Sequence, residues 1–350
     1  MIIPRLAIID DGVSHLCIPD GQPFECYIAD EHGVTQSTKP ESLDTHASVC
    51  YSMFKNFVQV PYHLISVKVI NHETGMGSKN ALLSALHWCK EQNIDLISMS
   101  IGTRQYLDFA QISEAVNALS KTIIIAACNN QNTLTYPACL PNVLGVHHCP
   151  EEAMRGKFAY IPTSYDQIEL MTCAGNASNS SAVPIMAARV CEYIANGLCG
   201  LEDIRQKLKE DAMQDTSFLN YEFFKNLLPE WGDVQVPVII LPYDIPKGVD
   251  RIKPLIAAFI QDGYRVAVLS QSHETCVVSH IYHLSWQFGE ISMSELIKLY
   301  YNFTLPDILF LHIKSSEVLL SDITADIVFE SHWLYKNTQC LFLKIKGMLS

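Results

Sequence analysis

The sequence predicts an α/β fold, in which a three-layer domain with a parallel sheet is followed by a second, smaller α/β domain. Apolar segments without polar interruption recur between stretches with helical spacing, as in LAIID at 6–10 and TIIIAAC at 122–128. Strands of a parallel sheet that helices cover on both faces are apolar in this way. The alternation resumes after residue 233, and two domains suit a chain of 350 residues.

The first domain is expected over 1–214. Its strands are predicted at 6–10, 63–70, 94–102 and 122–128, and its helices at 45–57, 78–93, 109–121, 184–197 and 197–214. The helix at 78–93 is amphipathic and begins at Ser78, a residue type that caps helices well. Pro184 is placed in the first turn of its helix, where a missing N–H costs nothing.

A linker is expected over 215–233 and a C-terminal α/β domain over 234–350. The predicted elements of this domain are strands at 236–243, 264–270 and 306–313, and helices at 250–262 and 292–301. Its first strand, loop and helix follow one another in the order of a nucleotide-binding unit. The loop, however, carries Asp244 and Pro246 where such a unit has glycines that face the phosphates. We interpret the domain as a module for partner or substrate recognition, whose exact role is unknown.

The composition excludes several classes of partner. Apolar residues make up 49% of the chain and charged residues 17%, with a net charge of −13, which disfavours nucleic acid and anionic membranes. The apolar runs are too short to cross a bilayer, and the N-terminus lacks the pattern of a signal peptide. The twelve cysteines form no C-x-x-C pair. Reduced, mostly buried thiols and a cytoplasmic location are therefore expected.

Four polar residues are predicted at the edge of the sheet where ligands of parallel α/β proteins bind. Asp10 ends the first strand, a helix begins at His46, Asn130 follows the strand at 122–128, and Ser180 precedes a helix. Taken alone, Ser180 would be interpreted as an N-cap. Together, the four supply a carboxylate, a base, an amide donor and a nucleophile, which is the set that acyl transfer needs.

The neighbours of these residues resemble those of the subtilisin-like serine peptidases over about residues 4 to 200. The carrying segments are LAIIDDGV, THASVC, the stretch 66–103, IIIAACNN, TYPACLPNVLGV (135–146) and SNSSAVP. The chain order Asp, His, Ser is also that of subtilisins. The resemblance implies a catalytic triad of Asp10, His46 and Ser180 and an oxyanion donor at Asn130. It also implies that Ser100, Ile101 and Gly102 bind the extended substrate, where a missing Cβ would admit a foreign backbone.

Neighbouring residues compete for two of these roles. Ser181 could replace Ser180, but the Ser-x-Ala-x-Pro pattern of the family selects Ser180. Asp11 could replace Asp10, although the two point to opposite sides of a strand. Other histidines are interpreted as core residues bonded to the backbone, namely His15, His63, His87, His147 and His148.

The chain departs from the family pattern in the small residues around the site. Asp11 replaces Ser or Thr, Ala47-Ser48 and Ser178-Asn179 replace Gly-Thr, and Asn129 replaces Gly. Asn tolerates positive φ, whereas Ala and Ser would be strained there. Because the triad and the oxyanion donor that the resemblance implies are all present, an active enzyme is expected. No cofactor or metal is predicted: relatives often bind calcium, but no Asp-rich loop is evident.

The predicted function is that of an intracellular serine endopeptidase that acts on a peptide or precursor protein. With neither a signal peptide nor a propeptide expected before the first strand, a narrow specificity would make such an enzyme safe in the cytoplasm. This favours a processing peptidase, for example one that removes the leader of a ribosomally made, modified peptide. The alternatives are a vestigial subtilase fold that binds a peptide or partner, and a general degrading protease.

Overall fold

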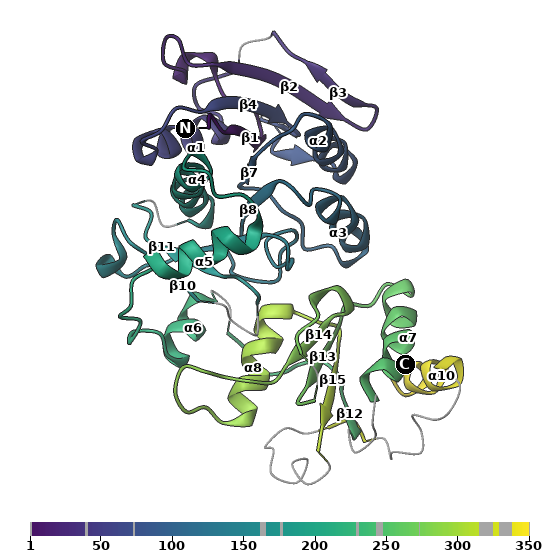
Figure 1. The fold of residues 1–350 in the computed structure, drawn as a ribbon. Helices are drawn as coiled ribbons and strands as arrows, with labels where there is room; N and C mark the ends of the chain where they lie inside the picture. The colour runs from purple at the N-terminus through teal and green to yellow at the C-terminus, as the bar shows by residue number, and fades with distance from the viewer. Residues whose placement is uncertain are drawn as a thin grey trace.

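The computed structural model describes most of the chain. The described residues are 2–38, 41–72, 74–161, 166–175, 178–228, 231–242, 248–272, 274–314, 325–328 and 338–349. Two units built on separate sheets follow one another, with the N-terminal unit in purple to teal and the C-terminal unit in green to yellow (Figure 1). Within these residues, no helix combines the length and the apolar character that crossing a membrane requires.

The N-terminal unit contains a nine-stranded sheet in the order β10-β11-β9-β8-β7-β1-β4-β2-β3. Its strands are parallel, except that β3 and β10 pair antiparallel with their neighbours at the two edges. The strands are β1 (Arg5–Asp10), β2 (Phe24–Asp30), β3 (Gly33–Gln36), β4 (His63–Lys68), β7 (Leu96–Met99), β8 (Ile123–Ala127), β9 (Leu144–His148), β10 (Phe158–Tyr160) and β11 (Leu170–Thr172). Beside the sheet, β5 (Ile70–Asn71) and β6 (Met76–Gly77) form a small hairpin.

Helices cover this sheet on both faces, as the apolar strands predicted. Along β1, Leu6 and Ile8 belong to the apolar cluster of one face, and Ala7 and Ile9 to that of the other. The first face is covered by α1 (His46–Phe57), α4 (Asn179–Ala195) and α5 (Leu201–Asp211), and the second by α2 (Lys79–Glu91) and α3 (Phe109–Asn117) (Figure 1).

The C-terminal unit has a five-stranded parallel sheet in the order β14-β13-β15-β12-β16. The strands are β12 (Val238–Pro242), β13 (Val266–Ser270), β14 (Ile281–His283), β15 (Ile308–Ile313) and β16 (Ile327–Val328). One face packs against α7 (Gly248–Gln261) and α10 (Thr338–Leu349), and the other against α8 (Met293–Thr304) (Figure 1). The sequence therefore predicted the class of this unit, while Asp244 and Pro246 of the loop lie outside the described residues.

One apolar cluster runs from the N-terminal unit into the C-terminal one. It joins residues of α3 to residues of β13 and α8, and it includes Phe223 and Phe224 of α6 (Tyr221–Leu227). The ring of Tyr106 stacks on that of His280 at a centroid distance of 4.4 Å, and its hydroxyl donates to the Thr304 carbonyl at 3.3 Å. The segment expected as a linker thus contains a helix whose two phenylalanines are buried.

The boundaries of the elements agree with the sequence prediction to within a few residues, with one instructive exception. The helix expected at 184–197 begins at Asn179, which places Pro184 inside it and not in its first turn. Ser178 is the N-cap, since its extended backbone (φ −144°) directs the hydroxyl to the Ser181 N–H. The local pattern did not reveal this start because the residues before Pro184 are small and polar, as they would be in a loop.

Candidate active site

The last residue of β1 and the first residue of α1 form the acid–base pair of the candidate site. Asp10 Oδ2 lies 2.8 Å from His46 Nδ1. The carboxylate is buried at 2% exposure, whereas 43% of the His46 side chain is accessible. This hydrogen bond is the main reason why the pKa of His46 is raised above its ordinary value. The hydrogen bond to Cys50 raises the pKa further by a smaller amount, whereas burial lowers it. The pair can therefore hold a proton on an imidazole that is partly accessible.

Asp11 has a different task from Asp10. Its two carboxylate oxygens accept from the backbone N–H groups of His46 and Ala47, at 2.9 Å and 2.8 Å. His72 Nδ1 lies 3.0 Å from the same carboxylate. Asp11 thus satisfies the free N–H groups at the start of α1, where a negative charge also suits the helix dipole. Of the two aspartates, Asp10 contacts the imidazole of His46, and Asp11 binds the start of the helix that carries His46.

Ser180 lies in the first turn of α4, and its main chain is linked to the His46 ring through one intervening side chain. The thiol of Cys50 bridges the two, with Sγ 3.8 Å from His46 Nε2 and 3.7 Å from the Ser180 carbonyl oxygen. Pro184 has no N–H to donate to the carbonyl four residues before it, which is that of Ser180. The Ser100 hydroxyl donates to this carbonyl instead, at 3.0 Å. The backbone of Ser180 is therefore bound to the end of β7.

The two adjacent serines differ in what their hydroxyls do. Ser181 Oγ lies 2.8 Å from Ser178 Oγ and is buried at 7% exposure, so it belongs to the helix cap. Among the hydrogen bonds of the described residues, none uses the hydroxyl of Ser180. The Ser180 hydroxyl is therefore not committed to the helix cap, and among the described contacts it forms no hydrogen bond to His46 of the kind that a nucleophile and its base share.

Asn130 follows β8 at the same edge of the sheet. Its Oδ1 accepts from the backbone N–H of Asn179 at 3.0 Å, so that its Nδ2 is turned away from that contact. Within the described part of the chain, that Nδ2 has no partner. Neighbouring Asn129 is instead held inside its own loop, where Nδ2 donates to Thr133 and Thr135 at 2.8 Å and 2.7 Å. Of the two asparagines, Asn130 is the one that offers an amide donor to a ligand.

The departures from the family pattern cause no backbone strain. The described non-glycine residues with positive φ are Asn93, Asn132, Gln167, His280 and Leu305, so that neither Ala47, Asn129 nor Ser178 is among them. The strain expected from replacing glycines at these positions is therefore absent, because the backbone there is not left-handed.

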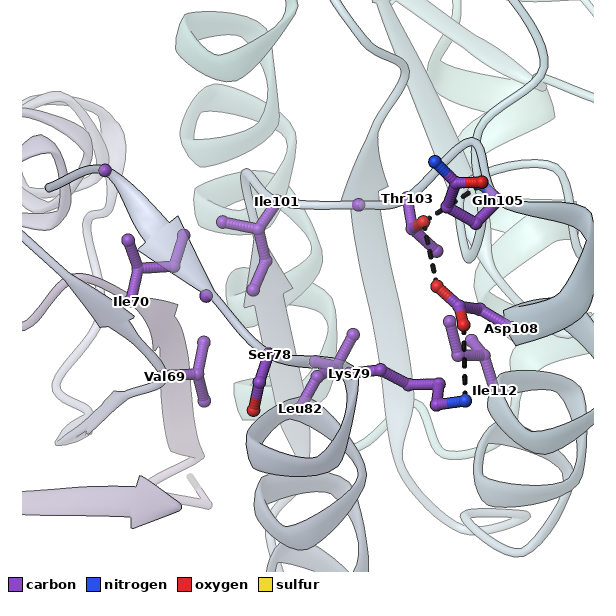
Figure 2. A pocket seen from close by; sticks show the side chains of 13 residues that line it. Val69, Ile70, Ser78, Lys79, Leu82, Ile101, Thr103, Gln105, Asp108 and Ile112 are labelled. Carbon is purple, nitrogen blue, oxygen red and sulfur yellow. Dashed lines mark hydrogen bonds and ion pairs between the residues drawn. The ribbon is translucent and has the colours of Figure 1, made fainter. Parts of the chain in front are cut away.

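Ser100, Ile101 and Gly102 follow β7, and Ile101 and Gly102 line a cleft of about 370 Å³ (Figure 2). The structure shows a second reason for glycine at position 102, besides the close approach of a substrate that the sequence predicts. A Cβ there would lie 2.7 Å from Thr135 Cγ2 and from the Tyr136 carbonyl oxygen, so the chain's own packing requires glycine.

The cleft is apolar on one side and polar on the other. Val69, Ile70, Leu82 and Ile101 contribute the apolar wall, while Ile112 lies beside the polar group (Figure 2). The polar side is built by Lys79 and Asp108, whose Nζ and Oδ1 lie 3.3 Å apart, and by the Thr103 hydroxyl, which donates to Asp108 at 3.2 Å (Figure 2).

One trio of side chains could hold a metal ion. The ligand atoms of Asp10, His46 and Cys50 lie within 4.8 Å of one another. A thiol and an imidazole suit zinc or a softer ion and not calcium, which prefers oxygen ligands. Such an ion would compete with the hydrogen bond between Asp10 and His46. We therefore interpret the trio as part of the acid–base site.

Sequence reasoning missed a group of buried polar residues behind Asn130. His147 was expected to bond to the backbone, but its ring nitrogens contact Asn132 Oδ1 at 3.0 Å and Asp166 Oδ2 at 2.7 Å. Asn179, 3% exposed, completes the group. No spacing in the sequence indicates these contacts, because they join loops that follow different strands.

Comparisons with known proteins cover the segment that holds the candidate residues. The model of the Subtilase family matches residues 6–218. Subtilisin DY of Bacillus licheniformis is 28% identical over 174 residues, which are 45% of this chain and 60% of that protein. The major intracellular serine protease of Bacillus subtilis (strain 168) is 30% identical over 92 residues, 24% of this chain and 28% of that protein. The chain thus covers 60% or less of the length of these relatives.

A solved structure is also similar. The crystal structure of a cold adapted subtilisin-like serine proteinase aligns with a TM-score of 0.44 and 18% identity, over 61% of this chain and 85% of that one.

Proposed function

The chain belongs to the subtilase family, and from that premise we propose that it is a serine endopeptidase that cleaves peptide bonds through an acyl-enzyme. The observation that carries the proposal is the 2.8 Å contact between buried Asp10 and accessible His46, together with Cys50, whose thiol links this pair to the main chain of Ser180. A merely structural serine at a helix start would use its hydroxyl in the cap, as Ser178 and Ser181 do.

The proposed reaction follows the chemistry of these groups. Ser180 Oγ attacks the peptide carbonyl while His46 Nε2 takes its proton, and Asp10 accepts a hydrogen bond from Nδ1–H and stabilises the imidazolium. His46 then gives the proton to the leaving amine. Water, deprotonated by the same imidazole, hydrolyses the ester on Ser180 and restores the enzyme.

The negative oxygen of the tetrahedral intermediate needs donors that are already in place. Asn130 Nδ2 and the backbone N–H of Ser180 are the proposed pair. The N–H of Ser180 is available because it lies in the first turn of α4, where no intrahelical carbonyl can accept it. An extended peptide is proposed to bind along Ser100, Ile101 and Gly102, with a side chain entering the cleft of Figure 2.

We further propose that the enzyme processes a specific peptide or precursor, such as one whose leader it removes, and that it acts in the cytoplasm. The mixed cleft supports a defined preference, since an apolar wall facing an ion pair discriminates between side chains better than an open surface does. Twelve cysteines recorded as free suit a reducing compartment.

Reaction with a fluorophosphonate tests the proposal. The expected result is one adduct per chain, mapped to Ser180 by mass spectrometry and abolished in Ser180→Ala. A folded protein that stays unlabelled would overturn it in favour of a subtilase fold that only binds a peptide. Rapid cleavage of casein at many sites would contradict the processing role while leaving the peptidase in place.

A further inference from the structure

We propose that Asn132 is a positioning residue for the oxyanion donor Asn130. In this proposal, the segment that joins the two units holds Asn132 in place, and Asn132 in turn holds the residues that orient Asn130. The proposal rests on the proposed peptidase function, since it concerns the same site. Asn132 touches neither the acid–base pair nor the nucleophile. It acts through Asn179, the residue that precedes Ser180.

Half-buried Asn132 is the centre of a set of hydrogen bonds. Its Oδ1 accepts from Asn179 Nδ2 at 2.7 Å and contacts His147 Nδ1 at 3.0 Å. Its Nδ2 donates to the carbonyl of Leu227, the last residue of α6, at 2.6 Å. Every polar atom of this side chain is thus used within the protein, in a residue held in the left-handed region with φ 51°. Asn is one of the few residue types that combine this backbone with a side chain that can make such bonds.

The orientation of both amides is fixed by partners that can act in only one way. The Leu227 carbonyl can only accept, so that Asn132 Nδ2 must face it and Oδ1 must face the other side. Asn179 Nδ2 donates to the Asn129 carbonyl at 2.6 Å, while its Oδ1 accepts from the His148 N–H at 2.6 Å. Each amide therefore has one permitted arrangement.

His147 and Asp166 extend the set into the core. Because Asn132 Oδ1 is an acceptor, His147 Nδ1 must carry a proton. His147 Nε2 lies 2.7 Å from Asp166 Oδ2, and the two side chains are 3% and 0% exposed. A second proton must lie between these atoms for a hydrogen bond to exist. The other oxygen, Asp166 Oδ1, accepts from the Ile168 N–H at 3.0 Å, which holds the carboxyl group in place.

The step to catalysis is the backbone of Asn179. Its N–H donates to Asn130 Oδ1 at 3.0 Å, and this contact sets the direction of the Asn130 amide. If Asn179 moved, the Asn130 Nδ2 group would no longer point toward the position proposed for the oxyanion. A displacement of about 1 Å of a catalytic group is enough to cost on the order of 10²-fold in rate.

The loop that carries Asn130 and Asn132 is also held by the segment between the two units and by the C-terminal unit. Leu227 supplies the carbonyl for Asn132, and the Phe303 carbonyl in α8 accepts from the Leu134 N–H at 2.9 Å. The loop that carries Asn130 is therefore held at two points by residues beyond α5. These contacts give the later part of the chain a role in the geometry of the oxyanion site.

The test compares Asn132→Gly with the wild type and with Asn93→Gly. Glycine keeps the left-handed backbone at position 132 and removes only the side chain. Asn93 has φ 50°, is exposed, and lies outside this set, so that Asn93→Gly is a matched control for the same substitution. We expect Asn132→Gly to lower kcat on a peptide substrate by about 10- to 100-fold with KM changed by less than about 2-fold, and Asn93→Gly to match the wild type.

Coupling to Asn130 separates positioning from general destabilisation. In an Asn130→Ala background, Asn132→Gly should cost less than about 3-fold, because the amide that it positions is gone. A full and additive loss there would overturn the proposal. If Asn132→Gly does not fold, Asn132→Asp is measured in the same way and with the same expected loss, because it keeps an acceptor for Asn179 but turns a carboxylate oxygen toward the Leu227 carbonyl and so breaks the anchorage.

A second readout does not depend on activity. The side-chain amide resonances of Asn130, assigned by their loss in Asn130→Ala, should shift in Asn132→Gly and not in Asn93→Gly. Unchanged resonances would contradict the proposal. If the wild type labels with a fluorophosphonate and Asn132→Gly labels equally fast, the positioning role fails and the peptidase stands. If the wild type does not label, the peptidase fails, and the resonances alone decide the role of Asn132.

Discussion

Phe224→Ala tests whether the two units fold as one cooperative body. Phe224 is 1% exposed, and its ring centroid lies 4.9 Å from that of Phe288 and 5.4 Å from that of Trp286, both in the C-terminal unit. It belongs to the apolar cluster that also contains residues of the N-terminal sheet. Removing a buried phenylalanine ring costs about 3–5 kcal/mol, from lost transfer free energy and the cavity left behind.

The assay is hydrogen exchange measured by mass spectrometry, with peptides from β1 and β4 compared with peptides from β13 and β15. If the shared cluster makes folding cooperative, the most protected amides of both sheets should lose the same free energy of protection, about 3–5 kcal/mol. Phe57→Ala is the control: this side chain is 43% exposed, and its loss should change stability by less than about 0.5 kcal/mol.

Loss of protection confined to β13 and β15 would refute the reasoning, because it would mean that the C-terminal unit opens independently. A cooperative result would imply that a chain ending at Gly232 melts early or aggregates, and does not survive as an isolated peptidase domain.

Three further predictions concern the site. Ser180→Ala should abolish labelling by a fluorophosphonate at an unchanged melting temperature, whereas Ser181→Ala should keep substantial activity, and the opposite pattern would show that the nucleophile is misassigned. The raised pKa of His46 predicts that kcat/KM rises with pH through an acid limb above pH about 6.5, since only the neutral imidazole is a base. Asp10→Asn should move that limb to lower pH as well as slow the reaction, and an unmoved limb would exclude Asp10 as the cause. Gly102→Ala should lower the melting temperature even without substrate, because the added Cβ meets the chain's own backbone at 2.7 Å, so an unchanged melting temperature would argue against that packing.

The sequence predicted those features of the fold that depend on local pattern. The apolar strand that ends at Asp10 and the helix that begins at His46 follow directly from periodicity and capping. Strands β2 and β3, at one end of the sheet, were missed, because their burial is partial and their sequences alternate little. Strands β9, β10 and β11 toward the other end were not predicted either. The residues of α6 looked like connecting material, since its phenylalanines become a core only when the C-terminal unit packs on them.

The candidate site likewise has a part that the sequence predicts and a part that it does not. Asp10, His46, Asn130 and Ser180 stand at the ends of elements, where sequence patterns are informative, and the structure brings them to one edge of the sheet. Their supporting contacts join loops distant in sequence: 34 positions separate Asn132 from Asp166, and single-chain periodicity carries no information on such pairs. That is why Asn132 could be found only from coordinates.

Pro184 has a mechanical consequence for the nucleophile. Because the proline cannot donate to the Ser180 carbonyl and the Ser100 hydroxyl does so at 3.0 Å, the main chain of the serine is tethered to the strand end that is proposed to receive the peptide. When a peptide pairs with residues 100–102, any displacement of that strand end is passed to the serine rather than absorbed by the helix. Binding of the proposed peptide would then be coupled to the position of the Ser180 main chain through this one hydrogen bond.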